Sequence, residues 1–411
     1  MNIVMGLVGI ITLLSIALLF SENRKAIKFR TVSLAFAIQA GFGAFVLYVP
    51  AGQAILSGIA AGVQAVIDSA QAGLDFLFGG LVSDKMFEVF GGGGFVFALR
   101  VLPIIIFFSS LIAVLYYLGV MQFVIKIIGG ALQKALKISR TESLSATANV
   151  FVGQTEAPLV VRPYIANMTR SELFAIMVGG LASVAGSVLA GYASLGVELK
   201  YLVAASFMAA PGGLLMEKIM IPETKVPSEK MEELSADQQP ANVIDAAASG
   251  AASGLQLALN VGAMLLAFIG LIALINTFVG WVAAMMGFDG ITIQLLLGYV
   301  FAPLAFLIGV PWHEAIQAGI FIGQKLIVNE FVAYIDFMTV KDSLSQHTQA
   351  IITFALCGFA NLSSIAILLG GLGAMAPTRR TELAQLGMKA VLAGSLSNLM
   401  SATLAGLFLS I

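Results

Sequence analysis

Long apolar runs separated by short polar segments dominate the pattern of hydrophobic positions along the chain. A helix that crosses a bilayer needs about 20 mainly apolar residues. The pattern predicts eight crossing helices, at residues 3–20, 31–50, 101–120, 173–196, 201–217, 251–286, 350–376 and 390–411. The run 251–288 carries no charged residue and exceeds one perpendicular crossing, so we expect a strongly tilted helix there.

The composition agrees with this pattern. Apolar residues make up 59% of the 411 positions and charged residues only 10%. Soluble domains are about 25% charged, so the composition excludes a water-soluble enzyme and predicts an all-α polytopic membrane protein. The net charge of −1 provides no field that would attract nucleic acid. The single cysteine, Cys357, excludes an internal disulfide or a multi-cysteine metal site.

The positions of Lys and Arg predict the orientation. Sixteen of the 21 basic residues fall in four loops that eight crossings place on one side, namely 21–30, 121–172, 218–250 and 377–389. Cytoplasmic loops carry the basic excess, so we expect these loops inside and both termini outside. The run 3–20 has no basic region before it, which favours a retained first crossing over a signal peptide.

Three regions outside the crossings have a different character. Residues 222–242 are rich in Pro, Glu, Lys and Gln, and predict a flexible cytoplasmic linker (218–250) between two halves. Residues 51–90 are Ala/Gly-rich and weakly amphipathic, which favours a helix along the outer interface. The glycine run 91–94 lacks the Lys-Ser/Thr of a phosphate loop and predicts a turn.

Two further segments, 143–168 and 291–335, are too apolar for loops and too polar for simple crossings. Each contains two prolines, which in the second are Pro303 and Pro311. Irregular backbone at membrane depth is tolerated only where it is buried in protein or lines a cavity. We therefore predict two re-entrant hairpins.

A similar stretch follows each hairpin, 179–186 (GGLASVAG) after the first and 357–364 (CGFANLSS) after the second. The first hairpin begins in the cytoplasm and the second outside, so the repeat would be inverted. Inverted repeats with broken helices are the architecture of secondary transporters. Chance similarity between two Gly/Ala-rich helices is the alternative.

Carboxylates at membrane depth are candidate functional groups, because an ionised one costs several kcal/mol unless it is paired or hydrated. Gln154, Thr155 and Glu156 offer an amide, a hydroxyl and a carboxylate that an unwound hairpin tip could bring together. A polar tip in cytoplasmic water is the alternative for Glu156. For Glu330, the alternative is a structural ion pair with Lys325.

Polar residues also interrupt the predicted seventh crossing. Asn361 carries a donor and an acceptor, and Ser363 and Ser364 follow it. The ring of Phe359 serves either core packing or stacking. In the first half, Asn149, Val152 and Ser183 supply oxygens of the kind a hard alkali cation binds, a weak signal from spacing alone.

Enzymatic machinery has no visible signature. The sequence contains no G-x-S-x-G or Walker motif, and His313 lacks the second histidine of a HExxH zinc motif. A membrane esterase or an ATP-driven pump is therefore not indicated. A passive channel would not need two hairpins with paired polar motifs.

Three motifs together resemble the signatures of the concentrative nucleoside transporter family, in particular its bacterial, eight-crossing, sodium-coupled type. They are Gly153–Pro158 (GQTEAP), Val328–Tyr334 (VNEFVAY) and Gly358–Ile365 (GFANLSSI), and the similarity extends over the whole chain. The resemblance implies a secondary active symporter that imports nucleosides, uridine-like and also purine nucleosides, with an inward sodium gradient. Proton coupling through Glu156 or His313 is the alternative.

The resemblance also implies roles for particular residues. The nucleobase set is Gln154, Thr155, Glu156, Leu257 and Phe359. The ribose set is Glu330, Asn361 and Ser364. The sodium set is Asn149, Val152, Ser183 and Val184, the second and fourth through backbone carbonyls. No cofactor is implied beyond Na⁺ as the coupling ion.

The same resemblance implies a homotrimer in the bacterial inner membrane that works by an elevator-type movement. A scaffold would be built from 1–120 and the long crossing 251–288, and the transport halves from 121–217 and 289–411, joined through the linker 218–250.

Overall fold

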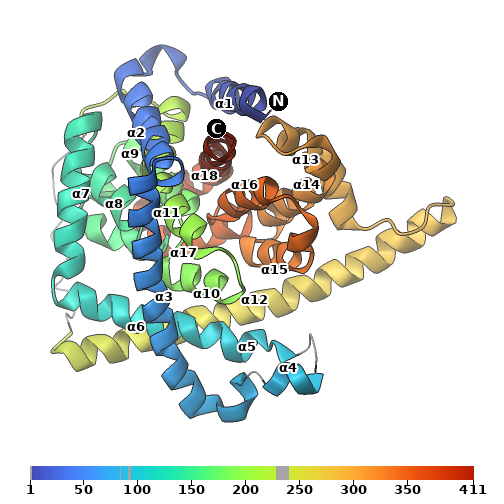
Figure 1. The fold of residues 1–411 in the computed structure, drawn as a ribbon. Coiled ribbons are helices and arrows are strands. Elements are labelled where there is room, and N and C mark those ends of the chain that lie inside the picture. The colour runs from blue at the N-terminus through green and yellow to red at the C-terminus, as the bar shows by residue number, and fades with distance from the viewer. Residues whose placement is uncertain (1, 84, 91–93, 228–239) are drawn as a thin grey trace.

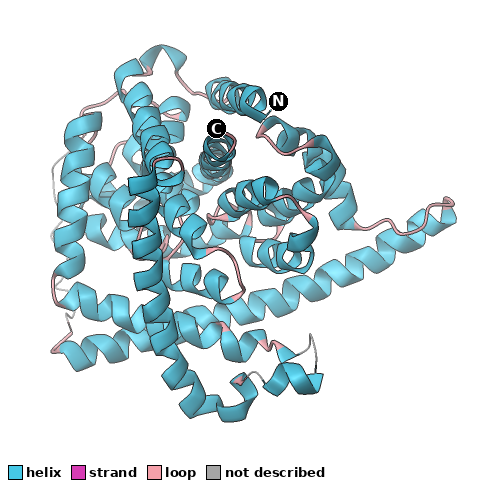
Figure 2. Ribbon diagram, in the orientation of Figure 1, coloured by secondary structure: helices cyan, strands magenta, loops and turns pink. Residues whose placement is uncertain are grey.

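The computed structural model describes residues 2–83, 85–90, 94–227 and 240–411, and every regular element within them is a helix (Figures 1 and 2). Residues 228–239 of the predicted linker and residues 91–93 of the predicted glycine turn lie outside the described residues, whereas the two ends of the linker are helical, within Leu199–Met220 and Val243–Met285. The all-α architecture predicted from composition and pattern is therefore confirmed.

The chain order divides into three groups of helices. The first is α1 (Asn2–Leu19), α2 (Phe29–Leu47), α3 (Pro50–Phe78), α4 (Lys85–Phe90), α5 (Phe97–Arg100) and α6 (Leu102–Tyr117). The second is α7 (Val120–Leu136), α8 (Arg140–Ala148), the 3₁₀ helix η4 (Ala157–Asn167), α9 (Arg170–Ala182), α10 (Gly186–Ser194) and α11 (Leu199–Met220). The third is α12 (Val243–Met285), α13 (Ile293–Leu307), α14 (Trp312–Ile327), α15 (Glu330–Val340), α16 (Gln346–Leu356), α17 (Ser363–Met375) and α18 (Arg380–Leu409).

Seven helical stretches in the described part of the chain are long and apolar enough to cross a membrane, and the bent pair α13–α14 makes an eighth if it is one span. The seven are Phe29–Leu47, Pro50–Phe90, Phe97–Tyr117, Arg170–Ser194, Leu199–Met220, Val243–Met285 and Pro377–Leu409. The stretch that contains α3 is among them, although the sequence favoured an interfacial helix there.

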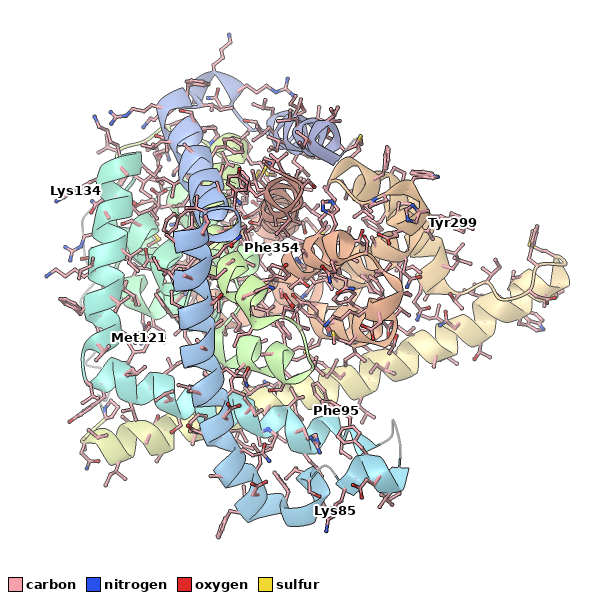
Figure 3. The ribbon with its side chains drawn as sticks, in the orientation of Figure 1. Lys85, Phe95, Met121, Lys134, Tyr299 and Phe354 are labelled. Atoms are coloured by element: carbon pink, nitrogen blue, oxygen red, sulfur yellow. The ribbon has the colours of Figure 1, made fainter. Side chains whose placement is uncertain are left out.

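The core is formed by helices from both halves of the sequence. Helices α9, α11 and α18 are buried along most of their length and contact one another. Small residues allow the close approach: a Cβ at Gly394 of α18 would lie 3.0 Å from Leu181 of α9. Phe354 is fully buried at the centre, whereas Lys134 and Tyr299 lie at the periphery (Figure 3). In contrast, α12 is a long rod that extends beyond the body of the molecule and exposes many apolar side chains (Figure 1).

The order of elements repeats between the second and third groups. A helix (α7 or α13) is followed by a hairpin (α8–η4 or α14–α15), a broken helix (α9–α10 or α16–α17) and a long helix (α11 or α18). The helical breaks fall at Ser183–Ala185 and at Cys357–Leu362. Each stretch predicted as one continuous crossing, 173–196 and 350–376, is therefore two half-helices.

The second hairpin is shorter than predicted. Helix α13 is a separate element, and the chain turns by 117° between it and α14. Pro303 lies inside α13 without ending it, whereas Pro311 is the N-cap of α14. A proline fits the start of a helix because no intrahelical partner is needed for its missing N–H. The hairpin therefore begins at α14, about twenty residues later than the sequence predicted.

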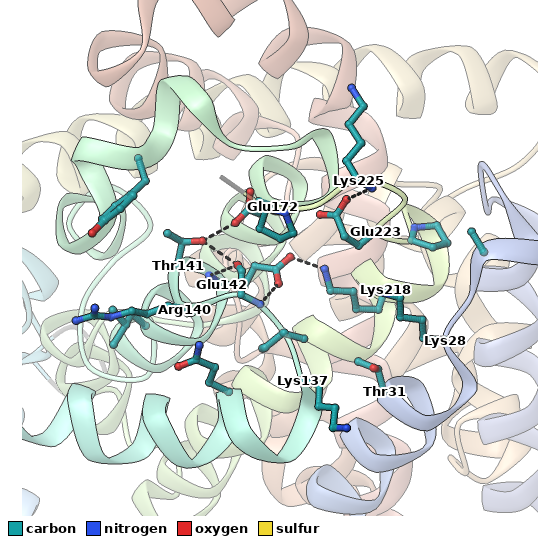
Figure 4. Close-up of a pocket in the computed structure, with 18 of the residues that line it drawn as sticks. Lys28, Thr31, Lys137, Arg140, Thr141, Glu142, Glu172, Lys218, Glu223 and Lys225 are labelled. Carbon is teal, nitrogen blue, oxygen red and sulfur yellow. Dashed lines mark hydrogen bonds and ion pairs between the residues drawn. The ribbon is translucent and has the colours of Figure 1, made fainter. Parts of the chain in front are cut away.

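Carboxylates tie the base of each hairpin to the broken helix that follows. In the first half, Thr141 of α8 donates to Glu172 of α9 over 2.8 Å, and Glu142 pairs with the buried Lys218 at one wall of a cavity (Figure 4). In the second, Glu314 of α14 accepts the backbone N–H of Ser345, the N-cap of α16, over 2.8 Å. Both hairpins are thus held at their bases by hydrogen bonds or ion pairs of carboxylates.

Candidate functional site

The two helical breaks meet inside the protein. The backbone N–H of Phe359, in the second break, donates to the carbonyl of Ser183, in the first, over 3.1 Å. The second hairpin is attached to the same place, because the N–H of Leu362 donates to the carbonyl of Leu326 over 3.1 Å. Backbone groups that no helix satisfies therefore pair with one another at the junction.

Glu330 lies at this junction with both carboxylate oxygens occupied. Tyr192 of α10 donates its hydroxyl to Oε1 over 2.9 Å, and Asn361 donates its amide to Oε2 over 3.0 Å. Asn329 orients the start of α15, since its side chain accepts the N–H of Val332 over 2.9 Å. Both partners of the carboxylate are donors, so it acts as an acceptor here.

The other predicted ribose residues belong to the same network. The side-chain oxygen of Asn361 accepts from the N–H of Ser364 over 2.8 Å, and Gln154 donates to the Ser364 hydroxyl over 3.3 Å. Glu330, Asn361, Ser364 and Gln154 are 4%, 2%, 1% and 6% exposed. The structure therefore brings the whole ribose set together with one residue of the nucleobase set.

The remaining nucleobase residues have different surroundings from one another. Glu156 is exposed, and with Leu257 of α12 it lines a cavity of about 690 Å³ between the first hairpin, α6 and α12. Thr155 is half-buried against Gly371 of α17, and Phe359 is half-buried at the break. Of these four residues, only Glu156 and Leu257 are among the described residues that line the cavity. The exposure of Glu156 fits the alternative of a polar tip in water as well as a base contact.

The predicted sodium residues are buried, two of them just after α8 and two in the break between α9 and α10. Asn149 is its C-cap, and Asn149, Val152, Ser183 and Val184 are all at most 4% exposed. The Asn149 amide donates to the carbonyl of Ser145, while its Oδ1 has no hydrogen-bond partner. The hydroxyl oxygen of Ser145 likewise has no partner. Buried oxygens without donors suit a hard cation, so this donor set fits an alkali ion.

Sequence reasoning missed the roles of three buried polar residues. Tyr192 looked like an ordinary aromatic residue in an apolar helix, and nothing in the pattern marked it as a donor to Glu330. Lys325 was considered only as an ion-pair partner of Glu330, whereas its ammonium donates to the carbonyl of Ala355 and to Asn398, each over 2.7 Å. Asn398 lies in an apolar helix, and a buried asparagine there was the one available signal.

Comparison with known families matches the chain in three segments. Residues 201–406 match the Na⁺-dependent nucleoside transporter C-terminus, and residues 8–81 match its N-terminus. Residues 98–198 match a family described as nucleoside recognition. The chain belongs to the Na⁺-dependent nucleoside transporter family: it is a multi-pass membrane transporter and not an enzyme.

Individual relatives agree over the full length. The nucleoside permease NupC of Helicobacter pylori is 52% identical over 411 residues, covering 99% of this chain and 98% of the permease. The sodium/nucleoside cotransporter 1 of Mus musculus is 38% identical over 419 residues, covering 97% of this chain and 63% of the cotransporter. CNTnw in an inward-facing, substrate-bound state is 61% identical with a TM-score of 0.96, over 99% of this chain and 98% of that one. The resemblance inferred from the three motifs is thereby confirmed.

Proposed function

We propose that this protein is a symporter that imports nucleosides, uridine-like ones and also purine nucleosides, with an inward Na⁺ gradient. The observation that carries the proposal is the buried network of Glu330, Asn361, Ser364 and Gln154, which joins both hairpins where the helical breaks meet. Buried polar groups are costly unless they are hydrogen-bonded, and this network still contains an unpartnered acceptor, Oε1 of Gln154.

The network has the chemistry that a nucleoside requires. A nucleoside is neutral but carries several donors and acceptors, so its site must replace water with matched hydrogen bonds. Glu330 accepts, and ribose hydroxyls can donate to its remaining lone pairs. The buried Oε1 of Gln154 has no partner and can accept from a base N–H. Thr155, Glu156, Leu257 and Phe359 complete the proposed base set, the last through its ring.

Sodium coupling is supported by the unpaired Oδ1 of Asn149 beside the first break. A neutral nucleoside cannot use the membrane potential, whereas one cation contributes about 2.3 kcal/mol per 100 mV. Val152 and Val184 would contribute carbonyls and Ser183 its hydroxyl. Binding there would order the first hairpin, which carries Gln154, and would couple the two sites thermodynamically.

An elevator movement of a homotrimer is the mechanism we propose. Helices α9, α11 and α18 join the two transport halves, 121–217 and 289–411, in one buried unit. The scaffold, 1–120 and 251–288, includes α12, whose exposed apolar side chains suit lipid or a second copy. The protein would lie in the bacterial inner membrane with both termini outside.

Labelled uridine uptake into proteoliposomes tests the proposal. One set of vesicles has an inward Na⁺ gradient at constant pH, and the other has an inward H⁺ gradient at constant Na⁺. We expect accumulation above equilibrium with Na⁺ alone. Asn149→Ala serves as the matched variant, because it removes the proposed ion ligand and leaves the network around Glu330 unchanged.

Three other outcomes are informative. Accumulation with H⁺ alone would retain nucleoside import and transfer coupling to a titratable group. Competition by adenosine or inosine but not by free uracil would support recognition of ribose. Absence of concentrative uptake with either gradient would refute the proposed activity.

A further inference from the structure

Lys325 is a buried cation that the proposed transport cycle does not use. It lies in the last turn of α14 and is 4% exposed. Its two hydrogen-bond acceptors, the carbonyl of Ala355 and Oδ1 of Asn398, are both neutral. Among the residues that the structure describes, no carboxylate forms an ion pair with it, and Glu330 acts on it only through a longer-range electrostatic attraction. A buried ammonium costs several kcal/mol without compensation, so a positive charge here needs further stabilisation.

A further stabilising feature is the end of a half-helix. Ala355 is the penultimate residue of α16, which ends at Leu356 where the second break begins. The unsatisfied carbonyls at a helix C-terminus carry about half a negative charge. The ammonium of Lys325 therefore faces the negative end of α16 inside the protein.

Asn398 of α18 extends this arrangement to the other half of the molecule. Its amide nitrogen donates to the carbonyl of Ala182, the last residue of α9, over 2.6 Å, and to that of Cys357 over 3.0 Å. Its oxygen accepts from Lys325, and since an ammonium can only donate, this orientation of the amide is the consistent one. One side chain thus contacts the C-terminal ends of both half-helices, α9 and α16.

The C-terminal ends of α9 and α16 differ in the side chain that lies next to them. Next to α9, the end of the first hairpin helix contributes Asn149, whose amide would lie 3.0 Å from a Cβ at Gly179 and whose Oδ1 is unpaired. Next to α16, the end of the first helix of the other hairpin contributes Lys325. In the repeated element order both residues lie where the first helix of a hairpin ends, Asn149 directly after α8 and Lys325 in the last turn of α14.

We infer that Lys325 is a fixed internal cation that takes, at the C-terminal end of α16, the place that a mobile Na⁺ takes at the equivalent end of α9. The inference rests on the proposed Na⁺ site at Asn149. In transporters with broken helices, half-helix C-termini are where coupling cations bind. The second repeat therefore has its cation covalently attached, and only the first exchanges one with solution.

The test asks whether removal of the amine opens a second Na⁺ site. The full-length protein is purified in detergent, and its melting temperature is compared in NaCl and in choline chloride at equal ionic strength. Asn149→Ala is expected to remove the Na⁺-dependent rise over the Na⁺ range in which the native chain responds, because its half-saturation should lie about tenfold higher. In that background, Lys325→Ser leaves space and oxygens at the end of α16, and we expect the Na⁺-dependent rise to return within that same range.

Matched substitutions serve as controls. In the same background, Lys325→Met fills the space without an oxygen, and Lys126→Ser removes an exposed lysine; neither should restore the response to Na⁺. With Asn149 intact, Lys325→Met should lower uridine uptake at least about tenfold, because a helix end is left without its cation. Lys325→Arg should retain more uptake than Lys325→Met.

Failure of the inference can be told apart from failure of the proposed function. If the native chain shows no Na⁺-dependent stabilisation, the proposed function fails. A folded double variant Asn149→Ala/Lys325→Ser without any response to Na⁺ would overturn the inference alone, as would normal uptake by Lys325→Met. If Lys325→Ser does not fold, Lys325→Asn takes its place. Should every neutral variant unfold while Lys325→Arg folds, a fixed positive charge is required there, as inferred.

Discussion

The two hairpins occupy equivalent places in the chain but differ in how far their polar groups are satisfied. In the second, both oxygens of Glu330 have donors and Lys325 has two acceptors, and among its described residues the buried Oε1 of Gln324 lacks a partner. In the first, Oδ1 of Asn149 and Oε1 of Gln154 are buried without partners. The first hairpin also has less regular backbone, with nine residues of α-helix in α8 followed by the 3₁₀ helix η4.

This difference indicates which hairpin needs bound ligands to satisfy its buried polar groups. A buried acceptor without a donor costs about 1–3 kcal/mol, and the cost is removed when a ligand supplies the missing contact. In the proposed transport cycle, the second hairpin would therefore be pre-organised for the nucleoside. The first would reach its best-satisfied arrangement only with ion and nucleoside bound, which would favour its closure over the loaded site.

We expect the largest effect on uptake from a substitution in the second hairpin. Glu330→Gln replaces an acceptor-only group with an amide that presents a donor to Tyr192 or Asn361. We expect uridine uptake to fall at least about a hundredfold, which corresponds to about 3 kcal/mol. Proteoliposome uptake measures it, with the exposed Glu198→Gln as the control. Near-normal uptake would remove Glu330 from the ribose site.

A substitution in the first hairpin should instead lower the apparent affinity for Na⁺. Asn149→Ala removes one oxygen ligand, so we expect the Na⁺ concentration for half-maximal uptake to rise about tenfold, or about 1.4 kcal/mol. The KM for uridine at saturating Na⁺ should change much less. The two constants are measured by varying Na⁺ and uridine separately. A change in the uridine KM alone would place Asn149 in the nucleoside site instead.

A smaller effect on the KM for uridine is expected from loss of the hydrogen bond between Tyr192 of α10 and Glu330 of α15. Tyr192→Phe removes one donor to Glu330 and keeps the ring packing against Phe331 and Tyr334. Loss of one such bond is worth about 1 kcal/mol, so the KM for uridine should rise about fivefold. Competition by 2′-deoxyuridine and 3′-deoxyuridine should report which hydroxyl meets Glu330. An unchanged KM for every analogue would mean that Tyr192 does not orient the carboxylate.

The smallest effect lies at the base of the first broken helix, outside the membrane-spanning segments. The Arg170 guanidinium, 3.0 Å away, holds the pKa of Glu22 below its usual value, and Lys389 adds to this. A lowered pKa gives stability that is present above the unfolded value of about 4.3 and is lost as pH falls through the folded value. Glu22→Gln should lower the melting temperature by about 1 °C at pH 7.

That difference between Glu22→Gln and the native chain should shrink as the pH is lowered toward 4 and below, because the native carboxylate then becomes protonated. Melting curves over this pH range check the direction. A difference that grows on acidification would contradict the assignment.

Much of the fold and of the candidate site could be predicted from the sequence. Apolar runs predict helices directly, and polar residues inside such runs are rare enough to mark Glu330, Asn361 and Asn149. The structure brings Glu330, Asn361 and Ser364 into one network, as the motifs suggested. Their roles in transport stay predictions.

Other features could not be predicted because they depend on tertiary contacts. Pro303 looked like a break, yet α13 accommodates it, and the hairpin begins only after Pro311. A pair between Lys325 and Glu330 was an open alternative because the two residues are close along the chain. Their actual partners come from α10, α16, α18 and the break before α17, and no local pattern encodes those distances.

The contact between Asn398 and Gly358 limits which residues the chain can hold at these two positions. A Cβ at position 358 would overlap the side-chain amide of Asn398, so only glycine fits opposite it. Asn398→Asp would remove the donors for two carbonyls, and Asn398→Gln would place a longer side chain in the same space. A library randomised at both codons and selected for uptake should therefore return almost only glycine with asparagine. Each of the two residues is allowed only in the presence of the other.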